Sequence, residues 1–198
     1  MKSFVYLKTV KTIFGNRKIS MLPKELSQIG KYPLLVYGNK SLKSSGNLTK
    51  IRNLLKKFKF AEFNGIKDEP DINMINEAYL LSESKKIDSV IAIGGGSVID
   101  ASKAIALAIG NKVSPIKIFR KKIKKNALPL ITIPTLPGSG SEVNGGGVIF
   151  VSGKKKEISG IFPKVSILDP KLNSNFSKSF ILGGISDAMV HVAEHYFN

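Results

Sequence analysis

A run of three glycines is followed by a serine, an acid and a lysine at helical spacing. In chain order these residues are Gly94, Gly95, Gly96, Ser97, Asp100 and Lys103. Glycines let a ligand approach the backbone closely, and the free N–H groups at the start of a helix attract an anion. The stretch therefore predicts a phosphate-binding turn between a strand and a helix, with a tight connection that binds no ligand as the alternative. Because residues three apart share one side of a helix, we expect Asp100 and Lys103 to lie together beside the turn.

Hydroxyl-bearing side chains gather in a second stretch, residues 135–144, which follows another apolar run. Its candidates for ligand contacts are Thr135, Leu136, Ser139 and Ser141. Glycine and proline favour a loop here, directly after a strand, and the loop would offer further hydroxyls to a phosphate. The alternative is a polar connection whose serines are incidental.

Three polar side chains recur every four residues near the C-terminus, at Asp187, His191 and His195. Helical geometry stacks side chains at this spacing on one face. A histidine near the C-terminus of a helix is favoured by the helix dipole, and we interpret His195 in this way. For Asp187 and His191, a solvated pair on the helix surface is the alternative to a role in binding.

Alternating strands and helices must position these residues. Apolar, β-branched runs predict strands over residues 33–37, 60–63, 89–93, 128–133, 145–151 and 165–168. Helical spacing predicts helices over residues 23–29, 48–58, 72–80, 98–109 and 177–198, with caps at Asp71 and Ser97 and an interruption at Gly183-Gly184. We also expect a hairpin at residues 13–16 and a turn at residues 154–156. This order predicts an α/β fold: a Rossmann-like, mostly parallel sheet with helices on both faces and ligands at the carboxyl ends of the strands.

Three stretches together resemble the signature of the iron-containing (group III) alcohol dehydrogenases, in the butanol dehydrogenase and NADPH-dependent aldehyde reductase branch. They are residues 94–103, residues 135–144, and residues 184–191 with Glu194 and Tyr196. The resemblance implies a nucleotide-binding α/β domain over residues 1–176. Residues 177–198 would then begin an all-helical metal-binding domain whose remainder is absent, since family members are about twice as long.

The chemistry that the resemblance implies is reversible hydride transfer between a nicotinamide and a primary alcohol or aldehyde. A divalent metal, iron or zinc, would polarise the substrate oxygen. Asp187 and His191 match two metal ligands of the family, which completes its site with two histidines from the second domain. The glycine turn would hold the pyrophosphate. Asp100 and Lys103 are the catalytic candidates, with Asp100 orienting groups near the nicotinamide and Lys103 either neutralising phosphate or anchoring the helix.

The residues after the strand at 33–37 bear on the choice of cofactor. An acid at this point would bind the ribose 2′-OH of NAD(H) and repel the 2′-phosphate of NADP(H). The candidates for contacts here are Gly38, Asn39, Lys40 and Ser41, and none is acidic. Gly38 leaves room, and Lys40 and Ser41 can meet a phosphate, so the sequence predicts NADP(H) over NAD(H).

The sequence departs from the family pattern in three places. Glu69-Pro70 stands where Asn-Pro is usual, so a cofactor contact there is in doubt. The turn around Lys154, Lys155 and Lys156 is short, so the sequence does not show which of these lysines, if any, takes the phosphate-side position of the family. The second domain is missing outright.

Composition narrows the other classes of function. The 198 residues carry a net charge of +17 and no cysteine, so there is no disulfide framework or thiolate metal site. No apolar run approaches a membrane span and the N-terminus lacks a signal peptide, so we expect a cytoplasmic protein without a membrane partner. The basic residues are almost all lysine, the exceptions being Arg17, Arg52 and Arg120. Because base readout and phosphate forks favour arginine, a nucleic-acid partner is not expected.

Three interpretations of the whole chain follow. The first is an NAD(P)-dependent, metal-containing alcohol dehydrogenase, here truncated and without full activity. The second is a non-catalytic nucleotide-binding remnant or one subunit of a split enzyme. The third, less favoured, is a basic nucleic-acid-binding module. The expected partners are a small alcohol or aldehyde and either a second copy in a homodimer or a separate C-terminal chain.

Overall fold

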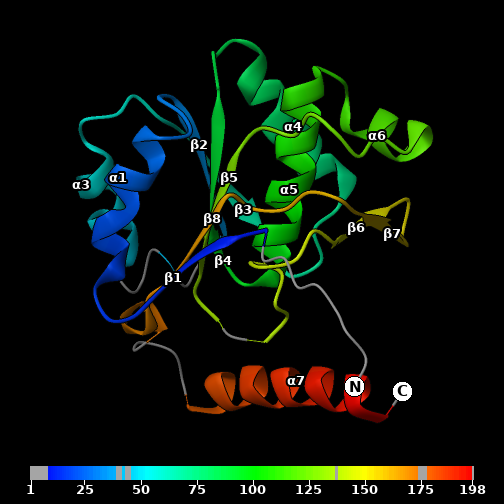
Figure 1. The fold of residues 1–198 in the computed structure, drawn as a ribbon. Coiled ribbons are helices and arrows are strands. Elements are labelled where there is room, and N and C mark those ends of the chain that lie inside the picture. Colours follow the sequence, from blue (N-terminus) through cyan, green and yellow to red (C-terminus); the bar gives the residue numbers. More distant parts are fainter. Residues whose placement is uncertain (1–8, 39–41, 43–45, 137, 174–177, 198) are drawn as a thin grey trace, which may run out of the picture.

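Parallel strands form the centre of the molecule in the computed structural model, which describes residues 9–38, 42, 46–136, 138–173 and 178–197. The strands of the main sheet are β1 (Lys11–Phe14), β2 (Pro33–Gly38), β3 (Ala61–Ile66), β4 (Ser89–Gly94), β5 (Leu130–Pro134) and β8 (Val165–Leu168). Among the described residues they lie in the order β1-β8-β5-β4-β2-β3, and every neighbouring pair is parallel (Figure 1). The predicted α/β fold is confirmed.

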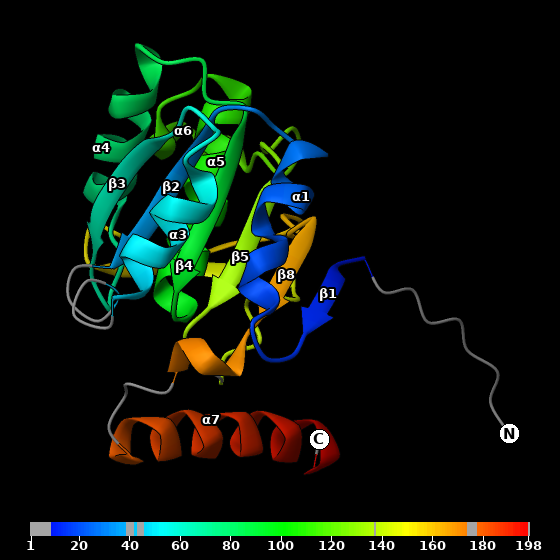
Figure 2. The same ribbon diagram turned by 90° about the vertical axis from the view of Figure 1, so that its left-hand side faces the viewer.

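Helices cover both faces of this sheet, as Figure 2 shows. They are α1 (Leu22–Ser27), α3 (Asn47–Leu55), α4 (Ile72–Glu83), α5 (Gly96–Asn111), α6 (Pro115–Lys121) and α7 (Lys178–Phe197), with the 3₁₀ helices η1 (Lys18–Met21) and η2 (Pro170–Asn173). Alternate strand residues divide between two cores: Leu35 and Ile91 pack with α1 and α3, whereas Leu34 and Val90 pack with α4 and α5. Strands buried on both faces need continuous apolar runs, which is the pattern the sequence has.

Helix α7 lies apart from these two layers, across the end of the sheet (Figures 1 and 2). The predicted interruption at Gly183-Gly184 is wrong, because α7 continues through both glycines. A glycine inside a helix costs only about 1 kcal/mol relative to alanine and does not by itself break it. The predicted boundary between residues 176 and 177 falls outside the described residues, so the division into two domains stays a prediction. No helix in the described part of the chain is long and apolar enough to cross a membrane.

A separate antiparallel hairpin joins β6 (Gly147–Val151) to β7 (Lys154–Ile158). The turn predicted at residues 154–156 is wrong, since these lysines lie in β7. The turn consists of Ser152 and Gly153, whose φ angles are 51° and 74°. Positive φ at both central residues matches the twist of a two-residue hairpin, so the turn begins two residues earlier than predicted.

The hairpin predicted at residues 13–16 is also wrong. Strand β1 pairs in parallel with β8, and the Gly15 N–H donates to the carbonyl of Leu168 at 3.1 Å. Gly15 and Arg17 both have positive φ, and they turn the chain into η1 instead of back into a second strand. The partner of β1 is therefore supplied by a segment distant in sequence.

Two predicted helix caps have different outcomes. Asp71 caps α4 as predicted, because its carboxylate accepts the N–H groups of Asn73 at 2.8 Å and Met74 at 3.1 Å. Ser97 does not cap α5, which begins at Gly96 with the extended Gly95 before it. The Ser97 hydroxyl instead donates to the carbonyl of Asp68 at 2.6 Å, so it ties the start of α5 to the loop before α4.

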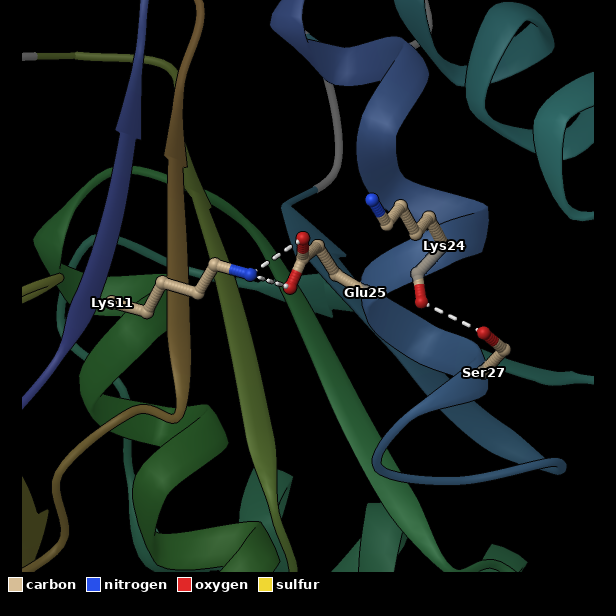
Figure 3. A network of polar contacts seen from close by, with 4 residues as sticks. All are labelled: Lys11, Lys24, Glu25 and Ser27. Carbon is tan, nitrogen blue, oxygen red and sulfur yellow. Dashed lines mark hydrogen bonds and ion pairs between the residues drawn. The ribbon is translucent and has the colours of Figure 1, made fainter.

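An ion pair fixes the edge strand β1 to α1 (Figure 3). The Lys11 ammonium donates to both carboxylate oxygens of Glu25 at 2.8 Å. Glu25 is fully buried, whereas Lys11 is about half exposed. On the same helix, the Ser27 hydroxyl donates to the carbonyl of Lys24 at 2.7 Å. Because a buried carboxylate is unfavourable without such a partner, Lys11 and Glu25 hold these two elements together.

Candidate functional site

The order of strands creates a switch point between β2 and β4. The chain leaves β2 toward β3 on one side, returns to β4 on the other side of β2, and then proceeds to β5. In open α/β sheets, ligands bind outside the carboxyl ends of strands at such a point. Gly38 ends β2 and Gly94 ends β4, so two of the predicted cofactor contacts lie at the switch point.

The three glycines of the predicted phosphate turn have different surroundings. A Cβ at Gly94 would lie 2.5 Å from Val98 Cγ2, and one at Gly96 would lie 2.6 Å from Ser139 Oγ. These two glycines therefore allow β4 and the second predicted loop to pack against the start of α5. A Cβ at Gly95 would meet no atom within 4 Å. Gly95 thus presents open space at the start of a sixteen-residue helix, where an anion is favoured.

A cavity of about 610 Å³ lies between the glycine turn, the second predicted loop and α7. Its lining residues are Gly96, Ser97, Asp100, Leu136, Ser139, Ser179, Gly183, Gly184 and Asp187. The fold therefore brings together six predicted site residues from three separate stretches. This volume is typical of pockets that bind small molecules. The sequence did not reveal the contribution of Ser179 and the two glycines, because the glycine pair was interpreted as an interruption.

The close approach of α7 depends on a glycine in the second loop. Gly138 has a φ of 147°, and a Cβ there would lie 2.7 Å from Asp187 Oδ2 and 3.2 Å from the carbonyl of Gly184. A side chain at this position would be strained by the positive φ and would require the Asp187 carboxylate to move aside. Gly138 therefore permits the close approach of Asp187 to the loop.

Asp187 and His191 supply two groups that can bind a divalent metal. Asp187 Oδ1 lies 3.6 Å from His191 Nε2, and the Glu194 carboxylate lies 3.5 Å from His191 Nδ1. One carboxylate and one imidazole fit iron or zinc as partial ligands, and both side chains are about half exposed. Among the described residues no group of three or more histidines or acids could hold a metal, and the side chain of His195 lies outside them. The ligand roles stay a prediction.

Asp100 and Lys103 lie one turn apart on α5, but only Asp100 lines a cavity. Asp100 lines the first cavity and also a neighbouring one of about 360 Å³, which Ser139 and Ser141 share. Lys103 is fully buried and lines neither cavity. Burial lowers the pKa of the Lys103 ammonium to about 8, and the nearby Asp100 and Glu142 oppose this shift. Of the two roles predicted for Lys103, the geometry favours the anchor over the neutraliser of phosphate.

The remaining predicted cofactor contacts either line neither cavity or lie outside the described residues. Thr135 is buried and lines neither cavity, and its N–H donates to the carbonyl of Gly94 at 3.0 Å. It thus ties the end of β5 to the end of β4. Asn39, Lys40 and Ser41 lie outside the described residues, so their cofactor contacts stay predictions.

Comparison with known proteins agrees with this arrangement. A family model described as iron-containing alcohol dehydrogenase matches residues 9–170. The chain belongs to this family. It is 38% identical to the Probable NADH-dependent butanol dehydrogenase 1 of Bacillus subtilis over 206 residues, which cover 100% of this chain and 53% of that protein. It is 31% identical to the NADPH-dependent aldehyde reductase YqhD of Escherichia coli, over 99% of this chain and 52% of that protein.

The solved structures of the iron-containing alcohol dehydrogenase family have the same fold. The crystal structure of NADH-dependent butanol dehydrogenase A from Thermotoga maritima superposes with a TM-score of 0.88 at 30% identity. The match covers 98% of this chain and 51% of that structure. The chain therefore spans about half the length of the relatives it matches, and it corresponds to their N-terminal part.

Proposed function

We propose that this chain is the cofactor-binding half of a metal-containing, NADP(H)-dependent alcohol dehydrogenase that acts on a primary alcohol or an aldehyde and lacks full activity by itself. The observation that carries the proposal is the cavity in which the glycine turn, the second loop and Asp187 meet. Butanol dehydrogenases and an aldehyde reductase among the relatives support the substrate class.

Each stretch of the site has a role in this proposal. The backbone N–H groups of Gly95, Gly96 and Ser97 hold the pyrophosphate at the start of α5, because the Ser97 hydroxyl already donates to Asp68. Asp100, at the wall of both cavities, orients polar groups of the nicotinamide end. Asp187 with His191 provides part of the metal site. When bound, the nicotinamide carries the hydride and the metal polarises the substrate oxygen.

The choice of NADP(H) depends on residues 38–41. Neither Gly38 nor the three residues after it carries an acid that would repel a 2′-phosphate, and Lys40 can attract one. The relatives divide on this point, since the Bacillus subtilis protein is named NADH-dependent and the Escherichia coli protein NADPH-dependent. We therefore base the proposal on the charges of the chain itself.

A titration with both reduced cofactors tests the proposal. The chain should enhance or shift the nicotinamide fluorescence of NADPH, and NADH should bind more weakly because Lys40 meets no 2′-phosphate on it. Gly95→Asp tests the site itself. Its side chain enters open space and should leave the fold intact, while its negative charge repels the pyrophosphate. Unchanged circular dichroism with lost binding is the expected result. Equal or tighter binding of NADH would refute the NADP(H) preference, and full binding by Gly95→Asp would refute the site.

A subunit of a split enzyme is the second candidate function, and the surface of α7 favours it. Met189 is 67% exposed, Val190 55% and Val192 72%, although all three are apolar. An apolar helix surface of this kind is typical of an interface. In this case the chain would bind cofactor and gain turnover only when a polypeptide with further metal ligands is added.

A further inference from the structure

Lys103 is a charged side chain with no exposure to solvent, on the side of α5 that faces the protein interior. Removing an ammonium from water costs several kcal/mol unless its donors are satisfied. The three N–H groups of Lys103 have three acceptors: Ser141 Oγ at 2.9 Å, Asn144 Oδ1 at 3.0 Å and the carbonyl of Gly146 at 2.5 Å. All three lie in the connection between β5 and β6. The ammonium therefore joins this connection to α5 at three points.

Asp100 reinforces the same connection from the preceding turn of α5. Its Oδ1 accepts the hydroxyl of Ser141 at 2.5 Å, and its Oδ2 accepts the N–H of Val148 at 2.9 Å. The Ser141 hydroxyl thus accepts from Lys103 and donates to Asp100. A Cβ at Gly147 would lie 3.2 Å from Asp100 Cγ, so a glycine at this position permits the contact. We call the side chains of Asp100, Lys103, Ser141 and Asn144 the α5 clamp.

Members of the α5 clamp form part of the walls of both cavities. Ser139, which lines both, precedes Ser141 by two residues, and its Oγ accepts the Ser141 N–H at 3.4 Å. Ser139 also lies directly beside Gly96, at the start of the helix. A shift of Ser141 would therefore move Ser139 relative to the glycine turn.

We propose that Lys103 is a positioning residue of the nucleotide site, which holds the β5–β6 connection against α5 without contacting the cofactor. This inference rests on the proposed function and develops one of the two roles predicted for Lys103, the anchor, in place of the neutraliser of phosphate. Asp100 keeps its place at the cavity wall, and its orientation depends on Ser141 and, through it, on Lys103. The residue matters because the cavity needs the connection in one fixed position.

The test compares Lys103→Met with Lys117→Met, which removes the same charge from an exposed position on α6. Two amides report the α5 clamp in the cofactor-free chain: the Gly146 N–H bonds to Asn144 Oδ1 at 3.0 Å, and the Val148 N–H bonds to Asp100 Oδ2. In Lys103→Met both should exchange their hydrogens faster, while amides of β4 stay protected. The Kd for NADPH should rise about tenfold or more. Binding is compared at a temperature at which the parental chain and both variants are fully folded.

A merely structural role for Lys103 would leave the affinity of the folded protein for NADPH unchanged, and this result would overturn the proposal. Unchanged exchange at Gly146 and Val148 would also overturn it. If Lys103→Met does not fold, Ser141→Ala decides, since it keeps the ammonium and removes the hydroxyl that joins Lys103 to Asp100. In Ser141→Ala, faster hydrogen exchange at the Val148 amide together with weaker NADPH binding supports the proposal. An exchange rate and a Kd equal to those of the parental chain contradict it. If the parental chain binds neither cofactor, the proposed function fails, whereas hydrogen exchange still tests the α5 clamp.

Discussion

The buried ammonium of Lys103 predicts that the fold becomes more stable as the pH rises through the mildly alkaline range. Burial lowers the pKa of this group from 10.5 to about 8 in the folded chain. Between these two values the unfolded chain holds a proton on Lys103 that the folded chain has released. Because the unfolded state then binds more protons, the free energy of unfolding increases with pH.

The size of the effect follows from the same pKa. Each unit of difference is worth about 1.4 kcal/mol, so the fall from 10.5 to about 8 corresponds to roughly 3 kcal/mol. The penalty is present in full below about pH 8 and is relieved progressively up to pH 10.5. Tyr37 acts in the opposite sense at the upper end, since its pKa is raised by burial and by its hydrogen bond to Glu62. Its contribution to stability is lost as the pH rises through that raised pKa.

Urea unfolding at a series of pH values between about 7 and 9.5 measures this dependence while staying below the range in which Tyr37 titrates. We expect the parental chain and Lys117→Met to gain stability over this interval. Lys103→Met should show a flatter profile, because the group that titrates differently in the folded and unfolded chain is gone. Parallel profiles for Lys103→Met and Lys117→Met would refute the reasoning. They would show that Lys103 carries no unusual pKa in the folded protein.

Two further predictions concern the edge of the sheet and catalysis. Lys11→Met leaves the Glu25 carboxylate buried without its ammonium partner and should cost about 2–3 kcal/mol in urea unfolding, whereas Lys24→Met, on the exposed side of α1, should cost little. Equal effects of the two substitutions would contradict the importance of the ion pair. The chain alone should oxidise NADPH with butanal and added iron(II) or zinc(II) far more slowly than about 1 per second, because the two proposed ligands, Asp187 and His191, are fewer than a catalytic metal site needs. Metal-dependent turnover above that rate would contradict this, and His195 would be the next residue to substitute.

Local sequence patterns predicted those parts of the fold that depend on neighbours in the chain. The buried strand before Gly94, the cap at Asp71 and the helix after the glycine turn each leave a signature within a few residues. No local pattern predicts the partner of strand β1, because that partner, β8, lies far away in the sequence. The turn of the β6–β7 hairpin was predicted two residues too late. A run of lysines is typical of an exposed loop, but the turn is made by Ser152 and Gly153, which have positive φ.

In the site, too, local patterns do not predict contacts between residues that are distant in sequence. Spacing places Asp100 and Lys103 on one side of α5, but it cannot distinguish a lysine that meets a phosphate from one that is buried. Lys103 is buried because its ammonium donates to Asn144 and Gly146, which are distant in sequence and come close only in the folded chain. Likewise, nothing local links Gly138 to Asp187, although a Cβ on the glycine would collide with that carboxylate.

The position of Asp187 explains why cofactor binding and catalysis should be separable in this chain. Asp187 lines the cavity into which the glycine turn opens, so a metal held partly by it would lie beside the bound nucleotide. The glycine turn and the α5 clamp, however, are built from α5 and the connections that follow β4 and β5, and they include neither Asp187 nor His191. A complete metal site needs at least three protein ligands, and α7 offers Asp187 and His191 on a helix that also exposes apolar side chains. The additional ligands should therefore come with whatever covers α7, and covering it would also exclude water from the reacting atoms.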